Sequence, residues 1–386
     1  MGRGVFTKRD LQAGDLIGIE EMFSWTIMDE CKYSRCLNCM KENYLMLIPC
    51  PNCTCAMFCS KKCLEDGTNK FHQYECPIIN FMYDYLPSNF ILTIRTLLNV
   101  INEFSTIKNC YTSCVESVTK NIYGDETSEF DFKDYKYSNG INLINSIYYD
   151  KSDAMAFFPY IPIIALLKYF LIRKTKLKEM VIEKEHQDFI SEAMLLYTRI
   201  IQDSSYGSKI IFSEDSPEFQ FLSPFESLFN HSCNPNVEHW IIGKKVYFLT
   251  LKPIKKGLQL LLNYCPDFGT LPKEHRILFL ESRNFVCRCE ACLKDYPTFN
   301  IEKAKNHKPK LYTRDFNAIL SNMGKINDMT PKQAYTYLKQ CSKFMEKYYY
   351  KFFPDQPVIL IERLITKIIS KLLGDESMKN VIKKNK

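Results

Sequence analysis

Cysteine spacing constrains this chain more than any other feature of its sequence. Between residues 36 and 76, metal-binding residue types occur in four pairs, each separated by two or three residues. Such gaps let both side chains of a pair face one ion, and eight ligands complete two closed tetrahedral zinc sites. This segment is therefore predicted to fold around metal, with sparse regular secondary structure. The pairs are Cys36 and Cys39, Cys50 and Cys53, Cys59 and Cys63, and His72 and Cys76.

A second cysteine group lies near residue 290. Cys287, Cys289 and Cys292 supply three thiolates, one fewer than a closed site requires. The fourth is expected from Cys233, in the upstream segment Asn230-His231-Ser232-Cys233-Asn234-Pro235-Asn236. A site shared by two distant segments would fix the later one onto the body of the fold.

Seventeen cysteines also permit a secreted, disulfide-bonded protein. Their paired spacing favours metal over disulfides, and the chain opens Met1-Gly2-Arg3-Gly4 without a hydrophobic leader. At 386 residues, with 46% hydrophobic and 25% charged residues, the chain resembles a globular protein that needs no cross-links. We therefore expect an intracellular protein, in the nucleus, the cytoplasm or both.

Two features bear on large partners. The net charge of +7 permits an acidic partner such as nucleic acid without requiring one, and Lys61, Lys62 and Lys70 are the candidate contacts. The apolar stretch at 154–172 is about long enough to span a membrane, but it contains two prolines and Lys168. We interpret it as a buried helix that starts after Pro162, and expect no membrane association.

Periodicity organises the rest of the chain. Short strands are expected over residues 2–30 and 206–265, with turns at Gln12-Ala13-Gly14-Asp15 and Gly243-Lys244. Helices are expected at 86–104 and 176–201, and two or three more over 310–375 with apolar residues at helical spacing. Residues 266–295 are expected to hold a short helix and the triplet, and 105–153 is interpreted as a loop and poorly ordered insert. The apolar positions include Leu338, Cys341, Phe344 and Met345.

The ligand order in the first group resembles a MYND zinc finger. The resemblance implies interleaved pairs, so that Cys36, Cys39, Cys59 and Cys63 hold one ion, and Cys50, Cys53, His72 and Cys76 hold the other. The segment Asn230–Asn236, together with Gly257-Leu258-Gln259-Leu260-Leu261-Leu262-Asn263-Tyr264, resembles the core of SET-domain lysine methyltransferases. The triplet resembles their post-SET segment. A SET domain interrupted by a MYND finger is typical of the SET and MYND (SMYD) family.

The resemblance implies a fold and its segments. The fold class would be α+β, with a small-stranded SET core, an inserted finger, a helical insert and an all-helical C-terminal domain. The expected segments are 1–35 for the N-terminal part of the SET domain, 36–76 for the finger, 77–220 for the helical insert, 221–265 for the SET core, 266–295 for the post-SET zinc segment and 296–386 for the C-terminal domain.

The resemblance also implies a site. S-adenosylmethionine would be bound by Gly2, Arg3, Gly4, Asn230, His231, Tyr264 and Phe285. Tyr264 would be the catalytic residue that aligns the substrate amine, and Phe285 would line the lysine channel. Cys233, Cys287, Cys289 and Cys292 would hold a third structural zinc. Cys31 and Cys55 fall outside the ligand pattern, and Cys265 is interpreted as a buried thiol.

The expected function is methyl transfer from S-adenosylmethionine to a lysine of a protein substrate, histone or non-histone. Departures from the family pattern are Leu258 and Gln259 in place of an acidic pair, and Arg283 in place of an aromatic residue. They leave one alternative, an adaptor with a degenerate SET domain whose finger binds a proline-containing peptide or a transcription partner. Substrate identity, degree of methylation and oligomeric state are left open.

Overall fold

The computed structural model describes residues 4–104, 106–119, 158–208, 219–281, 285–306 and 311–374; for 114–119 and 203–208 it describes the backbone alone. The described chain forms two compact units. The first comprises residues 1–20, 228–242 and 246–386, and the second comprises 21–227 and 243–245. Each is built from separate stretches of sequence, as expected when one domain is inserted into another.

Two small sheets form the β part of the first unit. One has the order β1-β11-β8, and the other has the order β2-β10-β9. In the first sheet, β11 runs antiparallel to β1 and parallel to β8, so Asn230 and His231 pair with Leu261 and Leu262. This register holds two segments of the predicted site side by side. The strands are β1 (Val5–Phe6), β2 (Leu16–Glu21), β8 (Asn230–His231), β9 (Val237–Ile242), β10 (Lys245–Thr250) and β11 (Gln259–Leu262).

Both predicted turns are present. Gly14, between β1 and β2, has a φ of +87°, and Gly243, between β9 and β10, has a φ of +57°. Positive φ is costly for residues with a Cβ, which accounts for glycine at both positions. The predicted hairpin is therefore confirmed, and so is the small-stranded character of the core.

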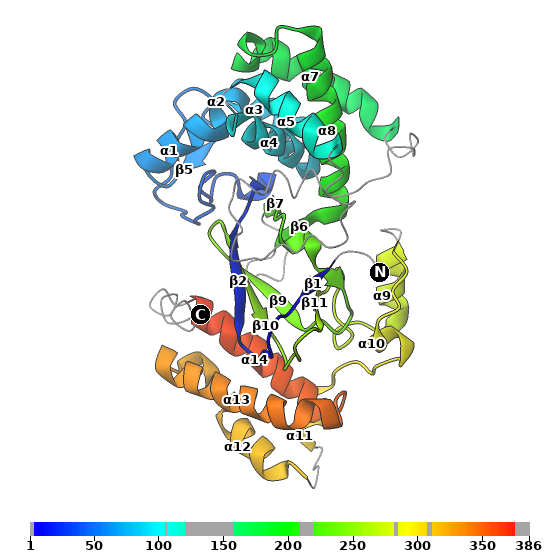
Figure 1. The fold of residues 1–386 in the computed structure, drawn as a ribbon. Coiled ribbons are helices and arrows are strands. Elements are labelled where there is room, and N and C mark those ends of the chain that lie inside the picture. The colour runs from blue at the N-terminus through cyan, green and yellow to red at the C-terminus, as the bar shows by residue number, and fades with distance from the viewer. Residues whose placement is uncertain are drawn as a thin grey trace. The chain divides into compact units, whose positions relative to one another are not determined.

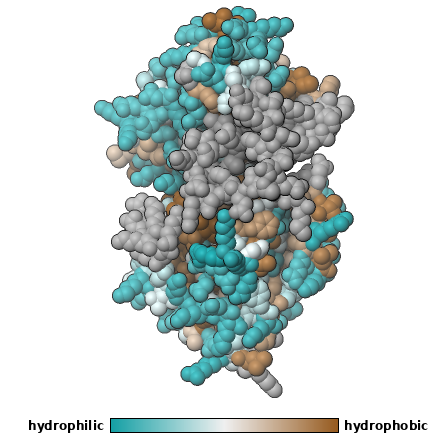
Figure 2. All heavy atoms as spheres, in the orientation of Figure 1, coloured by the Kyte–Doolittle hydropathy of each residue, from teal (hydrophilic) through white to brown (hydrophobic). Residues whose placement is uncertain are grey.

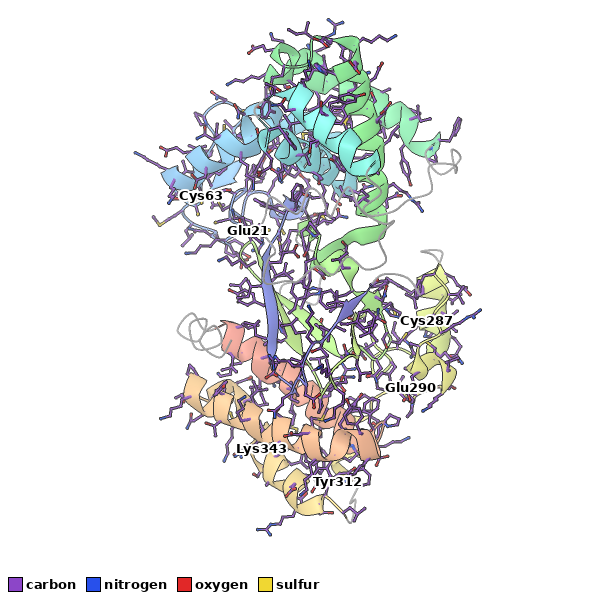
Figure 3. The ribbon with its side chains drawn as sticks, viewed as in Figure 1. Glu21, Cys63, Cys287, Glu290, Tyr312 and Lys343 are labelled. Atoms are coloured by element: carbon purple, nitrogen blue, oxygen red, sulfur yellow. The ribbon has the colours of Figure 1, made fainter. Side chains whose placement is uncertain are left out.

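The C-terminal region of the first unit is helical, as predicted. In Figure 1 its two longest helices lie beside each other, and both face the core that they share with β9 and β10. Leu338, Cys341, Phe344 and Met345 are all buried. Tyr312 is buried in this core, whereas Lys343 lies on the exposed face of its own helix (Figure 3). The helices are α9 (Lys273–Glu281), α10 (Glu290–Leu293), α11 (Ile301–Asn306), α12 (Thr313–Met323), η8 (Ile326–Asp328), α13 (Pro331–Phe352) and α14 (Gln356–Gly374).

Local sequence explains where α13 begins. The Thr330 side chain accepts from the Gln333 backbone N–H while Gln333 reaches back to the Thr330 N–H, and Pro331 occupies the first turn. This capping box satisfies donors that the helix leaves unpaired at its start. The visible outer surface of these helices is mainly hydrophilic (Figure 2), as their amphipathic pattern requires.

The second unit is built around one buried helix, α4. It packs on β3 and α8, and every residue from Phe90 to Ile101 is buried. Its polar residues bond to β3 and to the residue before it: Arg95 donates to Trp25 O at 3.0 Å and Asn99 donates to Phe23 O at 2.7 Å. The helix predicted at 86–104 is confirmed. The elements around it are η1 (Asp29–Cys31), β3 (Ser24–Ile27), α3 (Ile79–Tyr85), α4 (Ser88–Asn102), α5 (Ile107–Thr119), α8 (Lys184–Ser204), β6 (Ser205–Ser208), β7 (Phe219–Leu222) and η7 (Glu226–Leu228).

The structures predicted for two segments of this unit are wrong. The helix expected at 176–201 is two elements, η6 (Lys176–Glu179) and α8, because the Thr175 hydroxyl caps Leu177 and the chain then bends to bury Val181. The loop expected at 105–153 contains helix α5 at its start. The remainder of that loop, residues 120–153, lies outside the described residues.

From residue 158 on, the apolar stretch at 154–172 forms η5 (Phe158–Tyr160) and most of helix α7 (Ile161–Lys174), with Pro162 in the first helical turn; residues 154–157 lie outside the described residues. Only Ile164, Leu167 and Leu171 are buried, whereas Leu166 and Tyr169 are exposed. The expected buried helix is therefore buried on one face only. Among the described residues, none of the helices combines the length and the apolar character needed to cross a membrane.

Candidate functional site

The eight predicted ligands of the finger segment fall into two groups of four. Within each group, the ligand atoms lie within 4.8 Å of one another. Sγ of Cys39 is 3.5 Å from Sγ of Cys59, and Sγ of Cys53 is 3.5 Å from Nε2 of His72. Thiolates at about 2.3 Å from a tetrahedral zinc lie about 3.8 Å apart. The donor chemistry and spacing therefore fit zinc, and the groups are the interleaved ones: Cys36, Cys39, Cys59, Cys63 and Cys50, Cys53, His72, Cys76.

A short hairpin and a helical run hold these ligands. Ser60 accepts from the Cys63 N–H and caps α1, which carries Cys63 into place beside Cys59 (Figure 3). Helical structure then continues almost without a break to Glu75. The expectation of sparse regular structure is therefore wrong for the second half of this segment. The elements are β4 (Ile48–Pro49), β5 (Met57–Phe58), α1 (Lys61–Gly67), η2 (Thr68–His72) and α2 (Gln73–Glu75).

A buried ion pair supports the histidine of the second group. Glu75 and Arg95 are both essentially inaccessible, and the Arg95 Nε and Nη2 atoms donate to the Glu75 carboxylate at 3.0 and 3.1 Å. Oε1 of this carboxylate, which accepts from Nη2 of Arg95, also lies 3.4 Å from Nδ1 of His72. Burial alone would raise the pKa of Glu75, but the Arg95 charge and His72 hold that pKa at about 2. Glu75 therefore fixes the His72 ring so that Nε2 faces the thiols, a common support for histidine ligands.

We expect Glu75→Gln to destabilise the second unit by about 3–5 kcal/mol, because it leaves the Arg95 charge buried without a partner. Urea unfolding of the zinc-loaded protein measures this loss. The same change at Glu65, which is exposed on α1, is the matched control. A loss below about 1 kcal/mol, the usual range for a surface pair, would contradict this account.

The third group of thiols joins two distant segments, as predicted. Sγ of Cys233 lies 3.5 Å from Sγ of Cys292 and 3.9 Å from Sγ of Cys287, and the Cys233 N–H donates to Sγ of Cys289 at 3.4 Å. Cys287 lies just before α10, and Glu290 is the first residue of that helix (Figure 3). A small core that includes Phe268, Leu280 and Tyr296 surrounds the group. The four donors, Cys233, Cys287, Cys289 and Cys292, again fit zinc.

Arg276 is a charged neighbour of this group that sequence reasoning missed. It is fully buried on α9, and its Nη2 lies 3.9 Å from Sγ of Cys292. Although burial lowers the pKa of Arg276, the thiols of Cys292 and Cys233 raise it above its usual value. Four thiolates around one zinc ion carry a net charge of about −2, which the guanidinium offsets.

The predicted cofactor residues meet where β1, β8 and β11 come together. An ideal Cβ placed on Gly4 would lie 3.0 Å from Nδ2 of Asn230 and would overlap Nε2 of Gln259. Glycine lets the backbone at this position lie directly against the Gln259 and Asn230 side chains. Gln259, noted above only as a departure, therefore lies at the site itself. Gly2, Arg3 and Arg283 lie outside the described residues.

We expect Gly4→Ala to weaken binding of S-adenosylhomocysteine about tenfold, or about 1.4 kcal/mol, because the methyl group would displace Asn230 and Gln259. Gly324→Ala is the matched control, since a Cβ there meets nothing within 4 Å. Calorimetric titration of both variants measures the effect. Equal affinities in the two variants would contradict a role for Gly4 in binding the cofactor.

His231, Tyr264 and Phe285 form an aromatic cluster beside Asn230. The ring centroids are 5.1 Å apart for His231 and Tyr264, 5.5 Å for His231 and Phe285, and 6.0 Å for Tyr264 and Phe285. The Tyr264 hydroxyl donates to Phe229 O at 2.6 Å, and the Tyr264 N–H donates to Nδ1 of His231 at 2.9 Å. Cys265 is buried, as expected, and its Sγ lies within 4.8 Å of Sγ of Cys233 and a ring nitrogen of His231.

A buried lysine connects this region to the C-terminal helices. Lys252 donates to Oδ1 of Asn234, and its Nζ lies 3.3 Å from Oε1 of Glu362 on α14. The same Nζ lies 5.4 and 5.3 Å from the ring centroids of Tyr349 and Phe353. Burial lowers the pKa of Lys252 and raises that of Glu362. These contacts tie the segment Asn230–Asn236 to α13 and α14, a link that residue spacing does not reveal.

Two other surfaces bear on partners. Lys61 and Lys62 are exposed, but Lys70 is half-buried with its Nζ 5.4 Å from the Trp25 ring centroid, and burial lowers its pKa. Lys70 is therefore poorly placed to contact nucleic acid.

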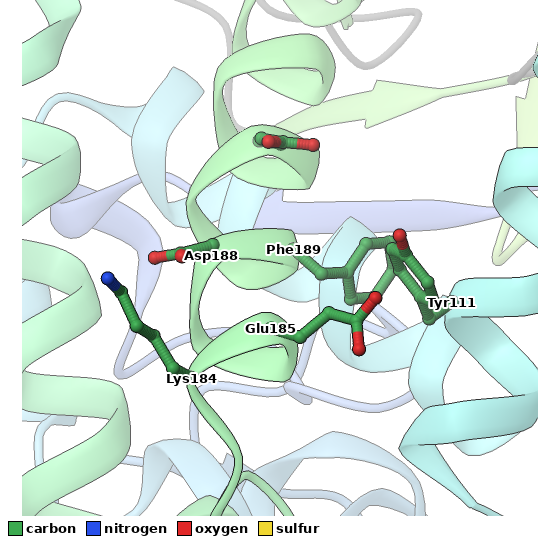
Figure 4. A pocket seen from close by; sticks show the side chains of 6 residues that line it. Tyr111, Lys184, Glu185, Asp188 and Phe189 are labelled. Carbon is green, nitrogen blue, oxygen red and sulfur yellow. The ribbon is translucent and has the colours of Figure 1, made fainter.

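In the second unit a hollow of about 360 Å³ lies between α5 and α8, where Tyr111 and Phe189 meet near Glu185 (Figure 4). None of the predicted site residues lines this hollow.

Comparison with known proteins agrees with this geometry. The family model of the SET domain matches residues 2–265. A SET and MYND domain-containing protein of Dictyostelium discoideum is 23% identical over 333 residues, which cover 81% of this chain and 83% of that protein. Protein-lysine N-methyltransferase SMYD4 of Mus musculus is 25% identical over 304 residues, 67% of this chain and 38% of that protein. The chain belongs to the SET domain family, and the resemblance to its SET and MYND members is confirmed.

Proposed function

We propose that the protein is a methyltransferase that moves a methyl group from S-adenosylmethionine to a lysine side chain of a protein. The observation that carries this proposal is the convergence of Gly4, Asn230 and the cluster of His231, Tyr264 and Phe285 at the β8–β11 pair. A glycine backbone, an amide side chain and an aromatic cluster there suit a cofactor with amino-acid and adenine portions. Family membership and the names of the relatives support the same chemistry.

Each residue has a distinct role in this proposal. When bound, S-adenosylmethionine supplies a methyl group carried on a sulfonium centre. Gly4 gives backbone access to it, and the Asn230 side chain holds its amino-acid portion. Gly2, Arg3 and His231 complete the contacts that the family resemblance implies. Phe285 closes the pocket and lines the channel through which the lysine enters.

The substrate amine must be neutral to attack, although a lysine has a pKa of about 10.4 in water. Tyr264 suits the task of orienting that amine. Because its hydroxyl proton is directed to Phe229 O, the Tyr264 oxygen offers a lone pair to an N–H of the amine. Alignment, together with removal of water by the surrounding rings, is the main contribution that the protein makes to such a transfer.

We assign structural roles to three zinc ions at the three ligand groups. Each group supplies four protein donors, either four thiols or three thiols and one histidine. A closed tetrahedral site leaves no position for water, so these ions would fix segments rather than act in catalysis. The third ion would hold Phe285 and the following segment beside the cofactor site.

Transfer of a labelled methyl group tests the proposal. The zinc-replete protein is incubated with methyl-labelled S-adenosylmethionine and a mixed protein pool, and the products are hydrolysed to amino acids. The proposal requires label in methyl-lysine, and none from a matched pool whose lysines have been acetylated. Label in other residues, or equal label from both pools, would refute lysine as the acceptor.

The finger also favours a peptide partner, which we propose as a second binding function. Tyr44, Leu45 and Met46 are 74%, 92% and 75% exposed, and Asn43 Oδ1 accepts from the N–H groups of Leu45 and Met46 at 3.0 Å. An ordered turn therefore presents adjacent apolar side chains to solvent, a feature typical of interaction sites. A proline-containing peptide, extended and without its full set of N–H donors, fits such a surface.

We expect Leu45→Ser to weaken binding of a proline-rich peptide library at least tenfold, because it removes the most exposed apolar side chain of the turn. Leu311→Ser is the control, since Leu311 is 76% exposed elsewhere on the chain. Fluorescence anisotropy measures both affinities. A loss of similar size in the two variants would count against a peptide site on the finger.

A further inference from the structure

We propose that His231 is a positioning residue that transmits the state of the third thiol group to Tyr264. Its two ring nitrogens face different partners: Nε2 lies 3.3 Å from Sγ of Cys233, and Nδ1 accepts from the Tyr264 N–H at 2.9 Å. The imidazole therefore connects a zinc-ligand sulfur to the backbone of the catalytic tyrosine. This inference rests on the proposed function, because it explains how the structural zinc supports the transfer site.

The direction of each hydrogen bond follows from the donor at Tyr264. A backbone N–H only donates, so Nδ1 of His231 is an acceptor and carries no proton. In neutral imidazole the proton then resides on Nε2, which donates to Sγ of Cys233. Which nitrogen carries the proton is thus fixed by the bond at the other one.

The same hydrogen bonds exclude a second metal site at His231. His231, Cys233 and Cys265 are buried and their ligand atoms lie within 4.8 Å of one another, as in a metal site. Nε2 can bind a metal only when it carries no proton, which requires Nδ1 to carry one and to donate it. Nδ1 instead accepts from Tyr264, so the cluster of His231, Cys233 and Cys265 is a hydrogen-bonded extension of the zinc site rather than a second metal centre.

The surroundings leave the ring little freedom. His231 is 8% exposed and lies on β8, whose backbone pairs with β11, and the next residue, Ser232, donates to Leu262 O at 2.8 Å. The Tyr264 and Phe285 rings pack on the imidazole. An N–H bond to a zinc-bound thiolate is charge-assisted and stronger than one to a neutral thiol. Zinc at the third group would therefore hold the imidazole, and through it the Tyr264 peptide, in one orientation.

Nuclear magnetic resonance of isotope-labelled histidine tests this arrangement without any activity measurement. The protein is loaded with an NMR-active cadmium isotope in place of zinc, and the chain has only six histidines to assign. We expect His72 to show coupling to cadmium through Nε2, and His231 to show a proton on Nε2 and no such coupling. A proton on Nδ1 of His231, or cadmium coupling to its ring, would overturn the proposal.

Two substitutions test separately the two hydrogen bonds of the relay, by which we mean the contacts from Cys233 through His231 to Tyr264. His231→Gln retains a donor near the Nε2 position but loses the acceptor for Tyr264, whereas His231→Asn retains the acceptor and loses the donor to Cys233. Support of this kind changes metal affinity or activity 10–100-fold. We expect His231→Asn to release the third zinc to a chelator at least tenfold faster while the finger ions remain, and His231→Gln to lower kcat at least tenfold with less effect on zinc release.

The control is His275→Asn, because His275 is exposed on α9. Release rates and kcat values within twofold of the unaltered protein for both His231 variants would overturn the relay. Should a variant fail to fold, the cadmium experiment on the unaltered chain still decides the matter. A chain with the expected His231 tautomer that transfers no methyl group would refute the proposed function and leave the relay intact.

Discussion

Replacement of Cys289 by serine is expected to remove one of the three proposed zinc ions and to lower kcat/KM at least 100-fold. Cys289 is a member of the third thiol group, and its Sγ accepts from the Cys233 N–H. Binding of a structural zinc ion is worth about 10–16 kcal/mol in small domains, so loss of one ligand frees the segment that the ion holds. That segment begins at Phe285, which packs on His231 and Tyr264.

Elemental analysis and a methyl-transfer assay on the same preparation measure both effects. Cys31→Ser is the matched control, because Cys31 belongs to none of the ligand groups among the described residues. It should retain three ions and near-normal transfer. Loss of the third ion with unchanged transfer would show that the metal does not support the site, and unchanged metal content would show that Cys289 is not a ligand.

Tyr264→Phe is expected to reduce kcat about 100-fold while the affinity for S-adenosylhomocysteine stays within about threefold. The substitution removes only the hydroxyl that would align the amine, and misplacement of a reacting group by about 1 Å costs about 100-fold. The backbone N–H of residue 264, which bonds to His231, is retained. Steady-state kinetics with a methylated-lysine readout, together with calorimetry, separates the two effects.

Tyr350→Phe is a close control for the lost hydrogen bond. The Tyr350 hydroxyl donates to Pro253 O at 2.8 Å, as that of Tyr264 donates to Phe229 O at 2.6 Å. Both variants therefore lose one bond from a tyrosine to a backbone carbonyl, but only one lies in the aromatic cluster. An equal fall in kcat for both would indicate a loss of stability rather than of alignment.

The ligand groups could be predicted from the sequence because the two ligands of each pair lie only a few residues apart. Cys36 and Cys39, or Cys287 and Cys289, are close in the chain whatever the rest of the fold does. The C-terminal helices could be predicted for a related reason. Apolar residues such as Leu338, Cys341 and Met345 recur at helical spacing, and this pattern indicates the buried face of the helix. The family resemblance then supplied the expectation that Asn230 and Tyr264 belong to one site.

The residues that sequence reasoning missed are those defined by partners far away in the chain. Glu75 bonds to Arg95, Arg276 approaches Cys292, and Gln259 lies against Gly4. Buried charged residues such as Glu75, Arg95 and Arg276 have no distinctive local pattern and resemble solvated side chains in the sequence, and nothing local links Gln259 to Gly4. The break before α8 was missed for a similar reason, because its lysines and glutamates favour a continuous helix locally.

The central claim is that this SET domain retains a working cofactor pocket, and binding of S-adenosylhomocysteine tests it most directly. Isothermal titration of the folded, zinc-loaded protein is predicted to give micromolar affinity, weakened at least tenfold by Asn230→Ala, because the Asn230 side chain, which lies against Gly4, would hold the amino-acid portion of the cofactor. Absence of binding by a folded protein that retains its zinc would contradict the methyltransferase assignment and favour an adaptor whose finger alone is functional.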